Sequence, residues 1–133
     1  MTNTATETLS VVVERELPFP PEKVWRALTQ PHLIEEWLMK NDFKPVVGQR
    51  FNFRADWGAV DCQVLAVEPN KALSYTWAAY GLESVVNWTL TPKSTGTHLR
   101  MEQSGFPQDK PQYYQGAKGG WFVRLEQALA RID

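Results

Sequence analysis

The side chains that could carry acid–base or metal chemistry are few in this chain. The two histidines, His32 and His98, lie far apart in the sequence, and neither accompanies a cysteine pair. This spacing does not match a structural zinc site. His98 alternates with Leu99 and Met101 in a strand-like segment, so we expect it on the surface. His32 begins a short helix and should also be exposed. We therefore predict no metal site.

Cysteine and aspartate give no catalytic pattern either. Cys62 is the single cysteine, and its alternation with Val64 and Ala66 predicts that all three point inward. A thiol in apolar surroundings is usually unreactive, so we predict that Cys62 belongs to the core or to the wall of a pocket and is not a nucleophile. Asp56 and Asp61 bracket a predicted hairpin, but they fall in the turn and on its outward face. We predict no carboxylate pair for acid–base work and no catalytic residue.

Motifs for cofactor binding or nucleophilic attack are missing as well. The glycines within 116–120 lie inside a predicted helix, whereas a phosphate-binding loop joins a strand to a helix. Ser104 lacks the first glycine of a nucleophile elbow. We therefore expect no cofactor. Arg15 leaves two alternatives open, because its strand parity points inward, yet a long side chain near a strand end can also reach solvent.

Aromatic rings are the most concentrated chemical feature of the sequence. The chain has 6 Trp, 6 Phe and 4 Tyr, or 12% of its residues. Rings fill cores, and they also line apolar ligand pockets. A packed aromatic core and a partly open pocket are thus both possible. Strand parity, helical phase and loop position direct one set of residues to a common interior, and we predict these as ligand-binding: Trp37, Phe53, Cys62, Tyr75, Trp77, Trp88, Met101, Phe106, Tyr114, Trp121 and Leu125.

The elements that must position these rings are strands, two short helices and one long terminal helix. An alternating strand is predicted over 9–17, and prolines then lead into two helices that together span 21–39. Five further strands with short links follow between 49 and 101, which favours an antiparallel meander. An amphipathic helix is predicted over 112–132. This order indicates an α+β fold with six strands.

Composition limits the function classes. The chain has 133 residues with 14 basic and 15 acidic side chains, a net charge of −1. This balance argues against nucleic acid or a membrane surface as partner. The chain has no signal-like N-terminus and no apolar run of the ~20 residues that a membrane span needs. We expect a soluble cytoplasmic protein, monomeric or weakly dimeric, with a flexible segment 1–8 and one domain over 9–133.

Several short motifs, in their order and spacing, are similar to a known family. They are Val24-Trp25, Trp37, Gly48, the run 64–69 leading into 73–77, the run 96–99, and Gly120-Trp121 with Leu125 and Leu129. Together they resemble the single-domain bacterial Hsp90-ATPase-activator-homologue family of the START-like (Bet v 1-like, helix-grip) superfamily. The likeness runs from about Leu9 to Ile132. It implies a curved antiparallel sheet, two short helices after the first strand, and a long C-terminal helix over a hydrophobic cavity.

The resemblance leaves several functions open, because members carry lipids or polyketides, bind hormones, act as aromatases or cyclases, or assist chaperones in stress responses. Fold alone does not choose among these. We favour binding of a small hydrophobic or aromatic molecule between the sheet and the C-terminal helix, without covalent chemistry. The alternatives are a cyclase, dehydratase or hydrolase that uses the same pocket, and a co-chaperone that binds an Hsp90-type partner through its surface.

Overall fold

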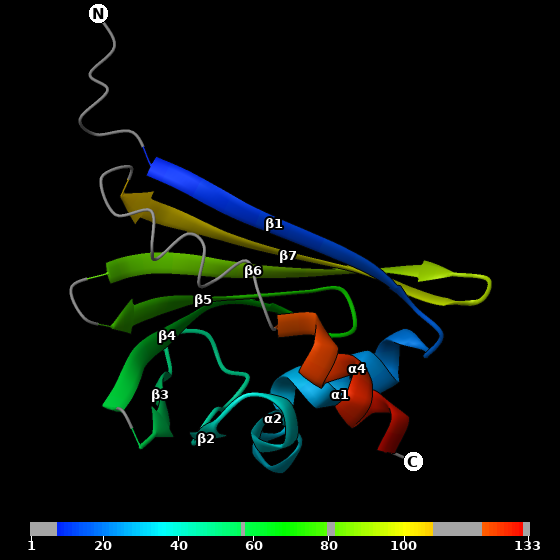
Figure 1. Ribbon diagram of the computed structural model, residues 1–133, viewed down its shortest axis with the longest axis horizontal. Helices are drawn as coiled ribbons and strands as arrows, with labels where there is room; N and C mark the ends of the chain where they lie inside the picture. The colour runs from blue at the N-terminus through cyan, green and yellow to red at the C-terminus, as the bar shows by residue number, and fades with distance from the viewer. Residues whose placement is uncertain (1–7, 57, 80–81, 108–120, 132–133) are drawn as a thin grey trace, which may run out of the picture.

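The computed structural model describes residues 8–56, 58–79, 82–107 and 121–131. Strands and helices follow one another as the sequence patterns predict, with one short strand in addition (Figure 1). The elements are β1 (Thr8–Leu17), α1 (Pro21–Thr29), α2 (Pro31–Trp37), β2 (Lys40–Asn41), β3 (Arg50–Ala55), β4 (Gly58–Glu68), β5 (Ala72–Ala79), β6 (Leu82–Lys93), β7 (Gly96–Pro107) and α4 (Trp121–Arg131).

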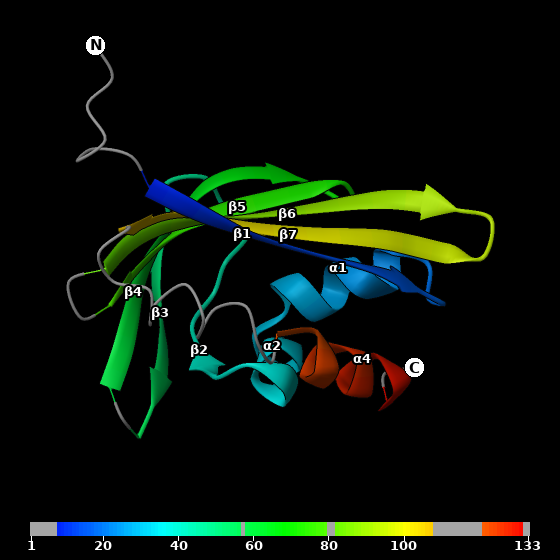
Figure 2. The same cartoon turned by 45° about the horizontal axis from the view of Figure 1, so that its top comes forward.

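The strands form one sheet in the order β1-β7-β6-β5-β4-β3-β2, and every neighbouring pair is antiparallel. The predicted α+β helix-grip fold is confirmed, but the sheet has seven strands instead of six. The additional strand, β2, has two residues, too few for an alternating pattern to reveal. Figure 2 shows the sheet curving, with β3 and β4 turned toward the side on which the helices lie.

The helices gather on one face of this curved sheet (Figures 1 and 2). Pro21 begins α1 at its first position, where the missing N–H costs nothing, and Val24 and Leu28 bury its apolar face. The terminal helix α4 packs on α1 and α2 through the buried residues Leu125 and Leu129. The predicted helix 112–132 is confirmed over 121–131, and 112–120 lies outside the described residues.

Alternation along the strands directs one row of side chains from each long strand into a common core. The predicted inward positions of Val86, Trp88 and Leu90 on β6 are confirmed, since all three are buried. The prediction for Ala66 on β4 is wrong, because the pairing with β5 shifts register between Val64 and Ala66. The extra residue reverses the alternation beyond that point, so Ala66 is exposed and Val67 packs against the core instead.

Candidate functional site

A continuous group of aromatic rings lines the inward side of β3 and β5. The Phe51 ring contacts those of Phe43 and Phe53 edge to face, at centroid distances of 4.8 and 5.4 Å. Phe51 also meets Tyr75 at 5.4 Å, and Phe53 meets Trp77 at 5.2 Å in a tilted pair. Edge-to-face geometry lets the positive edge of one ring meet the negative face of the next. These rings form a connected aromatic wall.

Two indoles continue this wall toward the helices. Trp88 on β6 meets Trp37 on α2 edge to face at 5.9 Å. The Trp88 Nε1–H donates to the Tyr75 hydroxyl at 3.0 Å, and the Trp37 Nε1–H donates to the Ala27 carbonyl at 2.8 Å. Ala27 is in the last turn of α1, where carbonyls lack helical partners. Both indoles are therefore hydrogen-bonded as well as buried.

The predicted ligand-binding residues converge on this interior wherever their side chains are described. Those that are buried and belong to the same core cluster are Trp37, Phe53, Cys62, Tyr75, Trp88, Met101 and Leu125. Trp77 packs against that cluster but is only partly buried. The side chains of Phe106 and Trp121, and the whole of Tyr114, lie outside the described residues. The common interior is confirmed for the described members, and their role in binding a ligand stays a prediction.

Two titratable groups in the described part of this interior are held in their neutral forms. Burial is the main cause that raises the pKa of the Cys62 thiol, and the carboxylates of Asp61 and Asp42 raise it further. Burial likewise raises the pKa of the Tyr75 hydroxyl, against the smaller opposing effect of its bond to Trp88. Both groups therefore stay protonated near neutral pH, so the Tyr75 hydroxyl is available as a hydrogen-bond donor.

The buried polar residues on the inward face of β6 and β7 include a hydrogen-bonded pair that was not predicted. Gln103 is 2% exposed, and its Nε2–H donates to the Ser84 hydroxyl at 2.9 Å. Ser84 donates in turn to the Trp77 carbonyl at 3.1 Å. Alternation with Met101 and with Val86 could have placed both polar residues inside. The predicted ligand-binding residues are aromatic, sulfur-containing or aliphatic, so neither Gln103 nor Ser84 is among them.

A surface hollow of about 480 Å³ lies beside this pair, across the ends of β5, β6 and β7. Trp77 and Ser84 line it together with residues of outward parity, which include Thr76, Val85 and Ser104. The hollow is open to solvent, so it is not the enclosed cavity that the sequence predicts. Two residues of the inward face, Trp77 and Ser84, nevertheless border this solvent-filled hollow.

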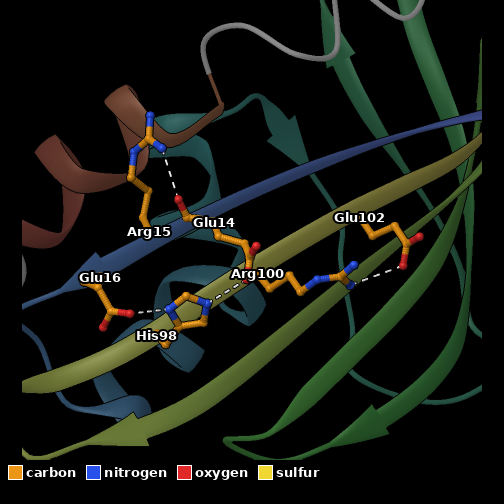
Figure 3. Close-up of polar contacts among 6 residues, drawn as sticks. All are labelled: Glu14, Arg15, Glu16, His98, Arg100 and Glu102. Carbon is orange, nitrogen blue, oxygen red and sulfur yellow. Dashed lines mark hydrogen bonds and ion pairs between the residues drawn. The ribbon is translucent and has the colours of Figure 1, made fainter.

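On the outward face of the sheet, Figure 3 shows His98 between two carboxylates of β1. Its Nε2 lies 2.8 Å from Glu14 Oε1, and its Nδ1 contacts Glu16 Oε1. These two carboxylates, Glu14 first, raise the pKa of His98. The predicted outward position of His98 is confirmed. Arg15 is half exposed and reaches Glu126 of α4 at 3.6 Å, so it does not give the interior a polar end.

Two broader searches of the described residues give negative results. No three His, Cys, Asp or Glu side chains among them are grouped so that they could hold a metal ion. In the same part of the chain, no helix has the length and hydropathy to cross a membrane.

Comparison with known proteins places these features in a family context. A family model described as "Activator of Hsp90 ATPase homolog 1-like protein" matches residues 18–132. The crystal structure of MLL2253 from Mesorhizobium loti has 65% sequence identity, a TM-score of 0.90, and coverage of 94% of this chain and 99% of that one. The solution structure of BH1534 from Bacillus halodurans has 27% identity, a TM-score of 0.80, and coverage of 91% and 96%.

DynU16, a protein from the dynemicin biosynthetic locus, is similar over part of its length. It has 27% identity and a TM-score of 0.81, and the alignment covers 91% of this chain but 47% of DynU16. No curated protein matches the sequence.

Proposed function

The chain belongs to the family of activator of Hsp90 ATPase homolog 1-like proteins, and from this membership we propose that it binds a small hydrophobic or aromatic molecule. The binding site is the interior between the sheet and the C-terminal helix, where the aromatic wall supplies apolar contacts. Binding involves no covalent step. The protein acts in the cytoplasm, which cell fractionation can test. It is a monomer or weak dimer, which sedimentation of the purified protein can test.

The observation that carries this proposal is the position of Trp77. Its ring stacks in a tilted pair on Phe53, which is 1% exposed, and its strand partner Ser84 is 5% exposed. Trp77 itself is only partly buried and borders a hollow. The aromatic wall thus continues from the sealed core to a ring that is partly exposed, as an apolar binding site requires.

A structural neighbour supports the same direction. DynU16 shares the fold and comes from a biosynthetic locus, which supports a biosynthetic molecule as the ligand.

The test is a titration with an apolar aromatic probe such as naphthalene. We expect quenching of tryptophan fluorescence and a higher melting temperature, because a ligand that binds only the folded state stabilises it by about 2.7 kcal/mol at 100 times its Kd. The variant Trp77→Ala should bind the probe more weakly. Leu65→Ala, which truncates a side chain that is 44% exposed on the outward face, is the control and should bind as the wild type does. If a broad panel of apolar and aromatic probes changes neither signal, the proposal fails.

An Hsp90-type chaperone as partner is the second candidate, and the description of the family favours it. On this alternative the protein would act through its surface and raise the chaperone's ATPase rate. The measurement is the ATPase rate of the cognate chaperone with and without the purified chain. An unchanged rate, together with no capture of the chaperone in a pull-down, removes this candidate.

A further inference from the structure

The side-chain amide of Gln103 is buried, and within the described part of the chain its NH₂ group is hydrogen-bonded whereas its oxygen is not. Its Nε2 donates to Ser84, whereas its Oε1 is shielded from solvent and has no hydrogen-bond partner among the residues that the structure describes. An unpaired buried acceptor costs free energy because its hydrogen bonds to water are lost, so proteins rarely keep one without a use. This cost requires an explanation, because a leucine would fit the position by alternation.

The surroundings of Gln103 are apolar on the inward face. In the sheet register, Gln103 pairs with Val11 of β1 on one side and Val86 of β6 on the other. These two valines are 1% and 0% exposed. Beyond Val86, the same row reaches Tyr75 on β5. The amide therefore lies between two buried apolar side chains, in a row that continues to the Tyr75 ring of the aromatic wall.

Ser84 fixes the direction in which this amide presents its oxygen. The Ser84 hydroxyl uses its proton on the Trp77 carbonyl, so it can accept from Gln103 but has no proton left to donate to it. The Gln103 NH₂ group must then face Ser84, and Oε1 faces the opposite way. The chain of hydrogen bonds from Gln103 to Ser84 and on to the Trp77 carbonyl thus fixes the orientation of the amide before any ligand binds.

We propose that Gln103, oriented by Ser84, is the polar recognition point of the interior site, and that the ligand is a hydrophobic molecule with a hydroxyl or N–H group that donates to Gln103 Oε1. This rests on the proposed function, because it names the class of molecule that the same interior binds. The aromatic wall supplies the apolar contacts, and the amide selects for the donor. A site built to pair a buried polar group rejects an analogue that lacks the matching group.

Three probes of similar shape test the proposal by calorimetric titration: naphthalene, naphthol and methoxynaphthalene. Naphthol can donate a hydrogen bond, methoxynaphthalene can only accept one, and naphthalene can do neither. We expect naphthol to bind the wild-type protein about tenfold more tightly than methoxynaphthalene, as for one buried hydrogen bond gained.

Two variants assign this preference to the amide. Gln103→Leu removes the acceptor, so naphthol and methoxynaphthalene should bind it equally, and its melting temperature without probe should not fall, because an unpaired polar group is also removed. Ser84→Ala keeps the acceptor but frees the amide to rotate, so the preference should shrink. Gln127→Leu, a matched change at an exposed position of α4, is the control and should keep the full preference. If Gln103→Leu does not fold, Ser84→Ala decides.

The outcomes separate this inference from the proposed function. If none of the probes binds, the proposed function fails and takes this inference with it. If all three bind the wild type equally, the interior site stands and the role of Gln103 is refuted. A preference for methoxynaphthalene, or a preference for naphthol that survives in Gln103→Leu, also refutes it.

Discussion

At the scale of single residues, His98 illustrates how a surface group becomes sensitive to pH. On β1, Glu14 and Glu16 lie on either side of its ring, and its partner on β6 is the uncharged Thr91 (Figure 3). The two carboxylates favour the imidazolium form and raise the pKa of His98 above its ordinary value of 6.5. Because folding raises this pKa, the pair stabilises the folded state below pH 6.5 and loses that effect as pH rises through the raised pKa.

We therefore predict that His98→Gln destabilises the protein most at mildly acidic pH. The difference in melting temperature between the wild type and His98→Gln should be largest between about pH 5 and 6, where the carboxylates are still ionised. It should shrink steadily toward pH 9. The effect is small, since all three groups contact solvent. Thermal melts over this pH range provide the measurement.

The double variant Glu14→Gln, Glu16→Gln is the control for this prediction. Without the two carboxylates, replacement of His98 should change the melting temperature by nearly the same amount at every pH. A difference between wild type and His98→Gln that grows toward alkaline pH would contradict the assigned direction of the pKa change.

Single residues also show where sequence patterns lose their force. Alternation predicted the inward positions of Tyr75 and Trp88 correctly, because successive side chains of a strand point to opposite faces of the sheet and a large ring stays on the face where it starts. It could not decide Arg15, whose parity is inward but whose side chain is long enough to leave the sheet and meet Glu126. Gln103 followed the alternation, yet its importance depends on an unpaired oxygen that the sequence does not reveal.

At the scale of elements, the β6–β7 hairpin is joined to the end of β1 by close backbone contact. Thr97 donates its hydroxyl proton to the Phe19 carbonyl at 2.7 Å. Gly96 has φ +151°, and a Cβ there would lie 2.0 Å from the Leu17 carbonyl oxygen. Only a residue without a side chain lets the two backbones approach this closely.

We predict that Gly96→Ala destabilises the protein by about 2 kcal/mol or more. The cost combines an unfavourable backbone conformation, of order 1–3 kcal/mol, with a forced movement of β1 away from the hairpin. Urea unfolding followed by circular dichroism measures it.

Gly48→Ala separates these two costs, since Gly48 also has a positive φ, +88°, but a Cβ there meets nothing within 4 Å. It should cost about 1 kcal/mol, the conformational part alone. Equal losses in the two variants would show that the approach to Leu17 contributes nothing.

Elements also set the limits of what the sequence could predict. The long strands and the helices were predictable, because each carries several apolar residues at a regular period. The register shift in β4 was not, since residues 64–67 are all apolar and give no alternation to follow, and only the pairing with β5 creates the extra residue. The two-residue strand β2 exists because Lys40 and Asn41 pair with β3, a tertiary contact rather than a local pattern.

At the scale of the whole molecule, Trp37 connects the helical layer to the sheet. Its indole N–H caps a carbonyl in the last turn of α1, its backbone ends α2, and its ring meets Trp88 of β6. The core cluster likewise contains residues of α1, α2 and α4 together with those of β1 and β3 to β7. Buried contacts that connect all layers predict a single cooperative unit, and the one domain expected over 9–133 stays a prediction.

We predict that Trp37→Phe lowers the stability of helices and sheet together. The substitution leaves the Ala27 carbonyl without its buried donor and opens space beside Trp88, at a cost of roughly 1–3 kcal/mol. Thermal unfolding followed by far-ultraviolet circular dichroism and by tryptophan fluorescence should shift to a lower temperature by the same amount. Trp25→Phe is the control: the described contacts include no hydrogen bond from the Trp25 indole and its ring is only partly buried, so it should cost less. If the two signals separate in Trp37→Phe, with the helical signal lost first, the layers unfold independently and the single cooperative unit is wrong.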